Sequence, residues 1–368
     1  MRRSRIPLRS FATGALLVLV TLGLVLPLVE AGLARFWSNP YQTLDRPSEK
    51  IPLYPGSLHV SLRTPELFGK AKRISLDTNF YRSLHRVFPG ERTSLAIGSM
   101  TTSNEILPEE ERWVEKIHPP AINYGYRGVG LGLSAQTIRF VQENVPINFS
   151  RILILSGLTD IRCFADDNCE NSPPPSVADA LFEQGESYFL GEPIRQSALY
   201  SFLFFHFTNL RGFSLNESAL FTEGTKPVLS QEDYIHFKNR VISTLLPQRN
   251  LWLKRILSLL KPSTELILLT QPNNYSEPLN PGQDLRNFPS LPVRGSRYRF
   301  SHSQIAELLM LVNQQSLSFA NAQANLKAID TGACVTSHLK SEEISWKGQF
   351  SQKGNAVFAA CVDQLLGH

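Results

Sequence analysis

Apolar residues gather in short runs that end in small or polar residues, from residue 93 of the 368-residue chain onward. The runs are rich in Leu, Ile and Val, as in the strands of a parallel sheet covered on both faces. Longer stretches between them repeat their apolar residues at helical spacing. The predicted strands are residues 93–99, 121–125, 151–157, 265–271 and 326–330. This alternation predicts an α/β fold, a three-layer α/β/α sandwich around a five-stranded parallel sheet.

The same pattern predicts helices over residues 134–144, 231–260, 303–320 and 354–366. Residues from about 163 to 231 interrupt the alternation and are predicted to be an insertion. Its most apolar part, Ala198 to Phe207, is predicted to be a buried helix, with a lid or a membrane-facing patch as alternatives. Residues 32–90 are rich in proline, show no clear period, and are predicted to be a juxtamembrane extension.

The N-terminus carries a long uncharged run, Ser10 to Val29, which is long enough to cross a bilayer as a helix. Arginines precede it at positions 2, 3, 5 and 9. Basic residues stay on the cytoplasmic side, so residues 1–9 are expected inside the cell and the rest outside. We predict an uncleaved transmembrane signal anchor over residues 10–31, with a signal peptide cleaved at residues 29–31 as the alternative. The expected location is a single-pass membrane protein whose domain is periplasmic or at the cell surface.

The formal net charge is +5, and the N-terminal arginines supply four of it. The rest of the chain is nearly neutral and lacks a basic cluster with interleaved aromatic residues, which argues against a nucleic-acid partner. Four cysteines permit two disulfides in an exported chain, and Cys163–Cys169 with Cys334–Cys361 is the simplest of three pairings. Buried free thiols are the alternative. No Cys/His spacing is typical of zinc, so neither a metal nor a cofactor is expected.

Small and polar residues follow the first three predicted strands. The three blocks read Gly98-Ser99, Asn123-Tyr-Gly125-Tyr-Arg-Gly128 and Gly157-Leu-Thr159-Asp160. A fourth block, Phe350-Ser351-Gln-Lys-Gly354-Asn355, precedes the last helix. Open α/β sheets build their sites where the strands end, so these blocks are expected to meet at one edge of the sheet.

In this order the blocks resemble the SGNH, or GDSL-type, hydrolase family over residues 91–368. The resemblance implies a flavodoxin-like sheet with Ser99 as the nucleophile and Ser99, Gly128 and Thr159 as oxyanion donors. It implies a serine ester hydrolase acting on an acyl or acetyl ester of a glycan or lipid. Without the resemblance, Ser99 would be interpreted as a helix cap and Gly128 as a turn glycine. Asp160 is expected to accept hydrogen bonds from nearby backbone.

The sequence departs from the family at the positions that matter most for catalysis. The catalytic His falls on Gln349 and the Asp on Trp346, while Thr159 replaces the usual Asn. An amide has no useful basicity, so Gln349 cannot be the base. His338, earlier in the same segment, is the candidate substitute base, with an exposed loop histidine as the alternative. The sequence therefore predicts an esterase of reduced activity. The alternatives are a degenerate relative that binds a carbohydrate or envelope partner and a scaffold component of an envelope assembly.

Overall fold

The structure is a computed structural model that describes most of the sheet-bearing part of the chain. The described residues are 8–36, 58–63, 72–76, 93–104, 107–125, 129–144, 147–165, 197–211, 213–214, 227–272, 291–293, 296–298, 300–340, 345–346 and 349–367.

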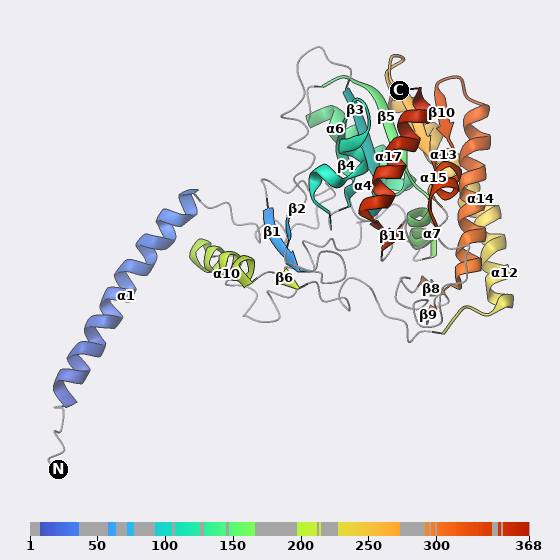
Figure 1. The fold of residues 1–368 in the computed structure, drawn as a ribbon. Coiled ribbons are helices and arrows are strands. Elements are labelled where there is room, and N and C mark those ends of the chain that lie inside the picture. Colours follow the sequence, from blue (N-terminus) through green and yellow to red (C-terminus); the bar gives the residue numbers. More distant parts are fainter. Residues whose placement is uncertain are drawn as a thin grey trace.

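A five-stranded sheet forms the centre of the fold, in the order β10-β7-β5-β3-β4 (Figure 1). Its strands are β3 (Thr93–Gly98), β4 (Ala121–Gly125), β5 (Phe149–Leu155), β7 (Glu265–Leu269) and β10 (Leu326–Ile329). All neighbouring strands are parallel, as the sequence predicted. Gly98 lies opposite both Gly125 and Leu155, so the three blocks that follow these strands begin at the same edge.

Helices cover both faces of this sheet and complete the three layers. Alternate residues of β5 point to opposite sides: Ile152 and Ile154 join one core, and Leu153 and Leu155 the other. The first core is closed by α6 (Leu131–Asn144), α7 (Leu158–Ala165), α12 (Gln231–Arg240), α13 (Leu246–Leu259) and α14 (His302–Asn321). The second is closed by α5 (Trp113–Lys116), α15 (Thr331–His338) and α17 (Gln352–Leu366). The predicted α/β/α sandwich is confirmed.

Short elements complete the described fold. They are α4 (Met100–Ser103), the 3-10 turn Glu109–Glu111, the π-helical turn Val241–Leu245 between α12 and α13, and the strand pairs β8 (Leu291–Val293) with β9 (Ser296–Tyr298) and β11 (Ser345–Trp346) with β12 (Gln349–Phe350).

A second sheet joins the extension to the insertion, which the sequence did not predict. The extension contains β1 (Leu58–Arg63) and β2 (Lys72–Leu76), which pair antiparallel. Residues 213–214 of the insertion form β6, which pairs parallel with β1. The sequence carried a signal that was missed, because Leu58, Val60 and Leu62 of β1 alternate with polar residues, as in a half-buried strand.

The two remaining helices lie away from the central sheet (Figure 1). The helix α1 (Leu8–Phe36) covers the predicted uncharged run, and its side chains are described from Val20 onward. Among the helical residues whose side chains are described, which in α1 begin at Val20, no stretch is long and apolar enough to cross a membrane. The helix α10 (Ala198–Arg211) was correctly predicted as a helix, but the prediction that it is buried is wrong. Leu203 is 56% exposed and Phe207 54%, because α10 packs on α1 and β1 instead of a sheet face.

Candidate functional site

Ser99 lies in the turn that ends β3 and starts α4. Its carbonyl accepts hydrogen bonds from the N–H groups of Thr102 (2.9 Å) and Ser103 (3.0 Å), and only 8% of the residue is exposed. A side chain at Gly98 would overlap the Thr102 hydroxyl and lie 2.7 Å from the Leu155 carbonyl. Glycine is therefore needed before the serine for β3 and β5 to lie this close. The position suits a nucleophile at the edge of an α/β sheet, and equally a residue that starts a helix.

The second block packs directly on this turn. The Asn123 amide donates to the Thr102 carbonyl (3.2 Å), and its oxygen accepts from the Gly125 N–H (2.9 Å). A Cβ atom at Gly125 would overlap the backbone of Thr102 and Ser103. Asn123 thus braces α4 against β4. Gly128 lies outside the described residues, so its role as an oxyanion donor remains a prediction.

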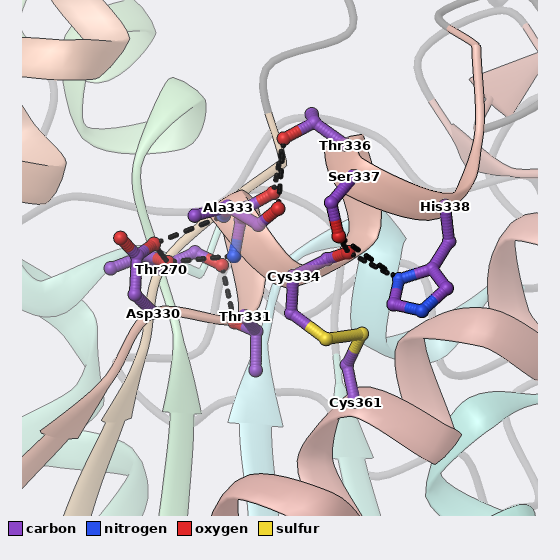
Figure 2. Close-up of a disulfide and its surroundings, with 10 residues drawn as sticks. Thr270, Asp330, Thr331, Ala333, Cys334, Thr336, Ser337, His338 and Cys361 are labelled. Carbon is purple, nitrogen blue, oxygen red and sulfur yellow. Dashed lines mark hydrogen bonds between the residues drawn. A yellow bond between two sulfur atoms is a disulfide. The ribbon is translucent and has the colours of Figure 1, made fainter.

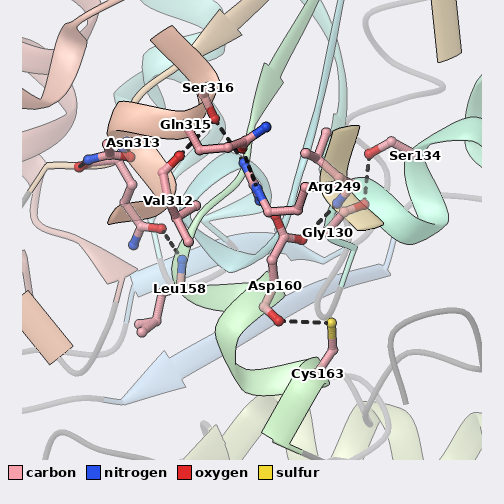
Figure 3. Close-up of polar contacts among 12 residues, drawn as sticks. Gly130, Ser134, Leu158, Asp160, Cys163, Arg249, Val312, Asn313, Gln315 and Ser316 are labelled. Atoms are coloured by element: carbon pink, nitrogen blue, oxygen red, sulfur yellow. Dashed lines mark hydrogen bonds and ion pairs between the residues drawn. The ribbon is translucent and has the colours of Figure 1, made fainter. Parts of the chain in front are cut away.

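The third block is held by a buried ion pair (Figure 3). Asp160 and Arg249 pair with no exposed side-chain surface on either. The Asp160 carboxylate also accepts from the Leu131 N–H (2.8 Å), at the start of α6. Arg249 donates to Gln315 (2.9 Å) and to Ser316 (2.8 Å) of α14. Asp160 accepts from backbone, as expected, but the expectation that this backbone is nearby in the chain is wrong, because Leu131 is 29 residues away.

Burial lowers the pKa of Arg249 to about 9, while the adjacent carboxylate of Asp160 favours the charged guanidinium. The Arg249 guanidinium therefore stays charged at neutral pH. Through the ion pair and the hydrogen bond to Leu131, Asp160 connects α7 with α13 and α6. Asp160 directly follows Thr159 in the sequence. Sequence reasoning missed Arg249. The apolar half of the predicted helix 231–260 also contains Arg255, so the sequence alone did not single out Arg249.

Gln271, which follows β7, fixes the start of the helix that carries Thr159. Its side-chain oxygen accepts from the Leu158 N–H (2.9 Å). Its own backbone is held at both polar atoms by Asn313 of α14, with N···Oδ1 at 3.2 Å and Nδ2···O at 2.8 Å. A Cβ atom at Gly157 would lie 2.9 Å from the Gln271 side chain. Thr159 is half-buried in the first turn of α7. This helix follows β5, and β5 lies next to β3, the strand that leads to Ser99.

The fourth block lies against the Ser99 turn. The carbonyl of Phe350 accepts from the side chains of Asn104 (2.9 Å) and Asn355 (3.2 Å). Asn104 ends α4 in a left-handed conformation, with φ of 42°. The Asn355 oxygen in turn accepts from the Trp113 N–H (2.8 Å). Ser351 caps α17 by accepting from the Gly354 N–H (2.8 Å).

Gln349 and Trp346 face each other in the backbone register. They are directly opposite in the antiparallel pair of β11 and β12, and Gln349 precedes the Phe350 that Asn104 holds. The side chains of both residues lie outside the described part of the structure. The backbone thus places the two positions at which the sequence departs from the family pattern next to each other, close to the turn that carries Ser99.

His338 lies at another place, beside a disulfide (Figure 2). It is the exposed last residue of α15, and its Nδ1 is 2.8 Å from the Cys334 carbonyl and 3.1 Å from the Ser337 hydroxyl. The Cys334–Cys361 disulfide was predicted and is present, with an S–S distance of 2.02 Å. Cys361 lies about 14 Å along α17 from Gln352, at 1.5 Å per residue. The described contacts of His338 therefore do not bring it to Ser99.

The same corner holds a group of metal-binding residue types. The donor atoms of Cys334, His338 and Cys361 lie within 4.8 Å of one another. Both sulfurs belong to the disulfide, which leaves only the imidazole as a ligand. Cys163 is also disulfide-bonded, and its expected partner Cys169 lies outside the described residues.

No family model matches the chain, and the comparison with curated proteins finds no match. Several solved structures are similar. A phospholipase A1 from Streptomyces albidoflavus is 13% identical, with 74% of this chain and 98% of that chain covered and a TM-score of 0.40. A lipolytic protein of the G-D-S-L family from Veillonella parvula is 12% identical, with 75% and 98% covered and a TM-score of 0.38. A variant acetylxylan esterase from Geobacillus stearothermophilus is 13% identical, with 77% and 96% covered and a TM-score of 0.35. The names include the family that the motifs resemble, but at these values the likeness carries no argument about activity.

Proposed function

We propose that the protein is an SGNH-type serine ester hydrolase of low activity, acting on an acyl or acetyl ester of a glycan or lipid. One observation carries the proposal. The Gly98–Ser99 turn and the block that begins at Gln349 lie together, joined by the hydrogen bond from Asn104 to the Phe350 carbonyl. In such enzymes the first position supplies the nucleophile and the second supplies its base.

The proposed chemistry assigns one role to each block. Ser99 attacks the ester carbonyl as its hydroxyl proton passes to water, the alcohol leaves with a proton from water, and a second water releases the acyl group as the acid. The oxyanion formed in each addition accepts hydrogen bonds from the Ser99 and Gly128 N–H groups and the Thr159 hydroxyl. Thr159 donates one hydrogen where the usual Asn donates two. Each lost donor costs about 100- to 1,000-fold in rate.

The base position limits turnover more severely. Gln349 cannot take a proton from Ser99 at neutral pH. Loss of the histidine from a serine triad costs on the order of a millionfold in kcat. The backbone register supports a direct test, because Cβ atoms of residues directly opposite in an antiparallel pair lie about 4.5–5.5 Å apart. At the positions of Trp346 and Gln349, this spacing lets an introduced carboxylate orient an introduced imidazole.

The test compares hydrolysis of p-nitrophenyl acetate by the wild type, Gln349→His, and the double variant Trp346→Asp with Gln349→His. We expect slow wild-type turnover and a larger gain for the double variant than for Gln349→His alone, because an unoriented imidazole is a poor base. Ser99→Ala in the double-variant background is the control and should remove the gain. His338→Ala should leave turnover unchanged, since its described contacts are at the disulfide. A gain that survives Ser99→Ala would refute the assigned nucleophile.

The second candidate function is binding without catalysis, and Gln349 favours it specifically. A pocket whose base has become an amide keeps hydrogen-bonding groups for a glycan while losing hydrolysis. The same variants separate the two functions. A double variant that folds yet shows no Ser99-dependent turnover, in a protein that retains an acetylated oligosaccharide on an affinity column, would support the binding protein.

We also propose that the run from Ser10 to Val29 anchors the protein in a membrane, with the domain outside the cytoplasm. The uncharged run and the preceding arginines support this orientation. The Cys334–Cys361 disulfide gives independent support, because disulfides persist in oxidising compartments. Protease added to intact spheroplasts should digest the domain, and alkaline carbonate should leave the protein in the membrane fraction. A protected or extracted protein would contradict the proposal.

A further inference from the structure

Exposed large apolar side chains concentrate on two helices, α1 and α10. On α1 they are Val20, Leu24, Val25, Leu26, Leu28, Val29 and Phe36, and on α10 they are Leu203 and Phe207. Among the described residues the other exposed large apolar side chains are scattered singly over the domain. Exposed apolar side chains gathered on two neighbouring helices indicate contact with a partner or a membrane.

Glu30 ties these two helices together. One carboxylate oxygen accepts from the Ala198 N–H (2.5 Å), and the other from the Leu199 N–H and the Ser197 hydroxyl (both 2.8 Å). The carboxylate therefore occupies the N-terminus of α10, where unpaired N–H groups and the helix dipole favour negative charge. Glu30 directly follows Val29, the last residue of the uncharged run of α1. The carboxylate that holds the start of α10 therefore lies at the end of that run.

The arrangement of exposed residues on α1 indicates what covers it. Leu24, Val25 and Leu26 are consecutive, so their side chains point in directions about 100° apart around the helix. A second helix would cover one stripe and leave the others in water. Lipid covers all sides of a helix that is apolar all round.

The composition of α10 suits the boundary between lipid and water. The segment is rich in aromatic residues and contains no acidic residue that anionic headgroups would repel. It ends in Arg211. Among the α10 side chains that the structure describes, the buried ones are small, Ala198 and Ser201, while the large side chains of Leu203 and Phe207 stay outside.

We propose that α10 lies on the membrane surface beside α1, with Leu203 and Phe207 in the lipid, and that Glu30 fixes it there. This inference rests on the membrane anchor proposed above. Because β1 packs on α10, the second contact restricts how the rest of the protein can turn relative to the membrane.

The test uses full-length protein in vesicles of phosphatidylcholine and phosphatidylglycerol. Four variants each carry one added cysteine: Leu203→Cys, Phe207→Cys, Leu24→Cys and Leu251→Cys. The added cysteine is labelled with the fluorophore NBD without reductant, since the described native cysteines are disulfide-bonded. Leu251 of α13 is the matched control, because it is 63% exposed and lies on the sheet-bearing part of the protein. We expect a several-fold rise in emission at positions 203, 207 and 24, quenched by nitroxide lipids, and no change at position 251.

The outcomes distinguish the two proposals. Quenching at position 24 with positions 203 and 207 behaving like 251 would overturn this inference and leave the anchor intact. No quenching at position 24 would overturn the anchor and the inference with it. Disulfide-linked dimers through the cysteine introduced at Phe207, formed without lipid, would assign the surface to a second copy of the chain.

The role of Glu30 has its own variants, measured with the label at position 207. Glu30→Ala should lose most of the quenching there while the label at position 24 keeps it. Glu30→Gln keeps an oxygen that can accept from the α10 N–H groups and should retain more. Full quenching in Glu30→Ala, in protein with unchanged circular dichroism, would refute the role of Glu30.

Discussion

The ion pair between Asp160 and Arg249 is the contact whose loss should be most costly among those at the site. Neither side chain is exposed, and the pair connects α7 to α13. Asp160→Asn keeps the size of the side chain and an oxygen that can accept from the Leu131 N–H. It removes only the charge, so the guanidinium of Arg249 is left in the protein interior without a counter-charge.

The expected cost follows from that isolation. Removing one partner of a buried ion pair destabilises a protein by about 3–5 kcal/mol. At about 2–4 °C per kcal/mol for a domain of this size, the midpoint of thermal unfolding should fall by about 6–20 °C. The paired change Asp160→Asn with Arg249→Met should recover much of this loss, because replacing both ions with uncharged groups of similar size is often nearly neutral.

The assay is thermal and urea unfolding of the full chain, followed by circular dichroism. Glu265→Gln is the matched control, because Arg151 and Glu265 form a partly exposed pair 3.6 Å apart. Exposed pairs contribute about 0–1 kcal/mol. Asp160→Asn and Glu265→Gln proteins that unfold at the same midpoint would refute the argument that burial makes the difference.

Three further predictions concern the packing around the site and the domain. Gly125→Ala should destabilise the protein by about 1–3 kcal/mol in urea unfolding, because its Cβ would overlap the α4 backbone. Asn104→Ala should cost about 1–3 kcal/mol by losing the bond to Phe350, and Asn104→Gly should cost less because glycine tolerates the positive φ. Hydrogen bonds from Lys238, and then from Tyr234, lower the pKa of Glu307, so its contribution is present above the carboxyl's ordinary pKa of 4.5 and is lost as pH falls through the lower folded value. Glu307→Gln should flatten the acid limb of the stability curve, measured by urea unfolding at several pH values.

The central sheet could be predicted from the sequence because its physical signal is local. A strand segment covered on both faces is apolar without interruption, as residues 152–155 of β5 and 266–269 of β7 are, and such runs are visible without knowledge of their partners. The disulfide between Cys334 and Cys361 was also predictable, since few pairings exist for four cysteines. The strand ends from which the first three blocks begin lie in register, as predicted, because the ends of parallel strands share one edge.

The contacts that hold the site could not be predicted, because each joins residues far apart in the chain. Arg249 pairs with Asp160, and Gln271 binds the N–H of Leu158, across long separations. The exposure of Phe207 was mispredicted for a related reason. The sequence of an apolar helix does not show whether protein or lipid covers it. Only the elements that lie beside the helix in the structure distinguish these two cases.

Gly98 and Gly125 are required by packing alone. A side chain at Gly98 would overlap Thr102 and crowd the Leu155 carbonyl, and one at Gly125 would overlap the backbone of Thr102 and Ser103, whatever chemistry takes place. A chain that loses hydrolysis would still need these two glycines to fold. At the fourth block the described contacts are made by the Phe350 carbonyl, and the side chain of Gln349 lies outside the described part of the structure. The first three blocks therefore report the fold, and Gln349 is the position that reports whether the site can still take a proton from Ser99.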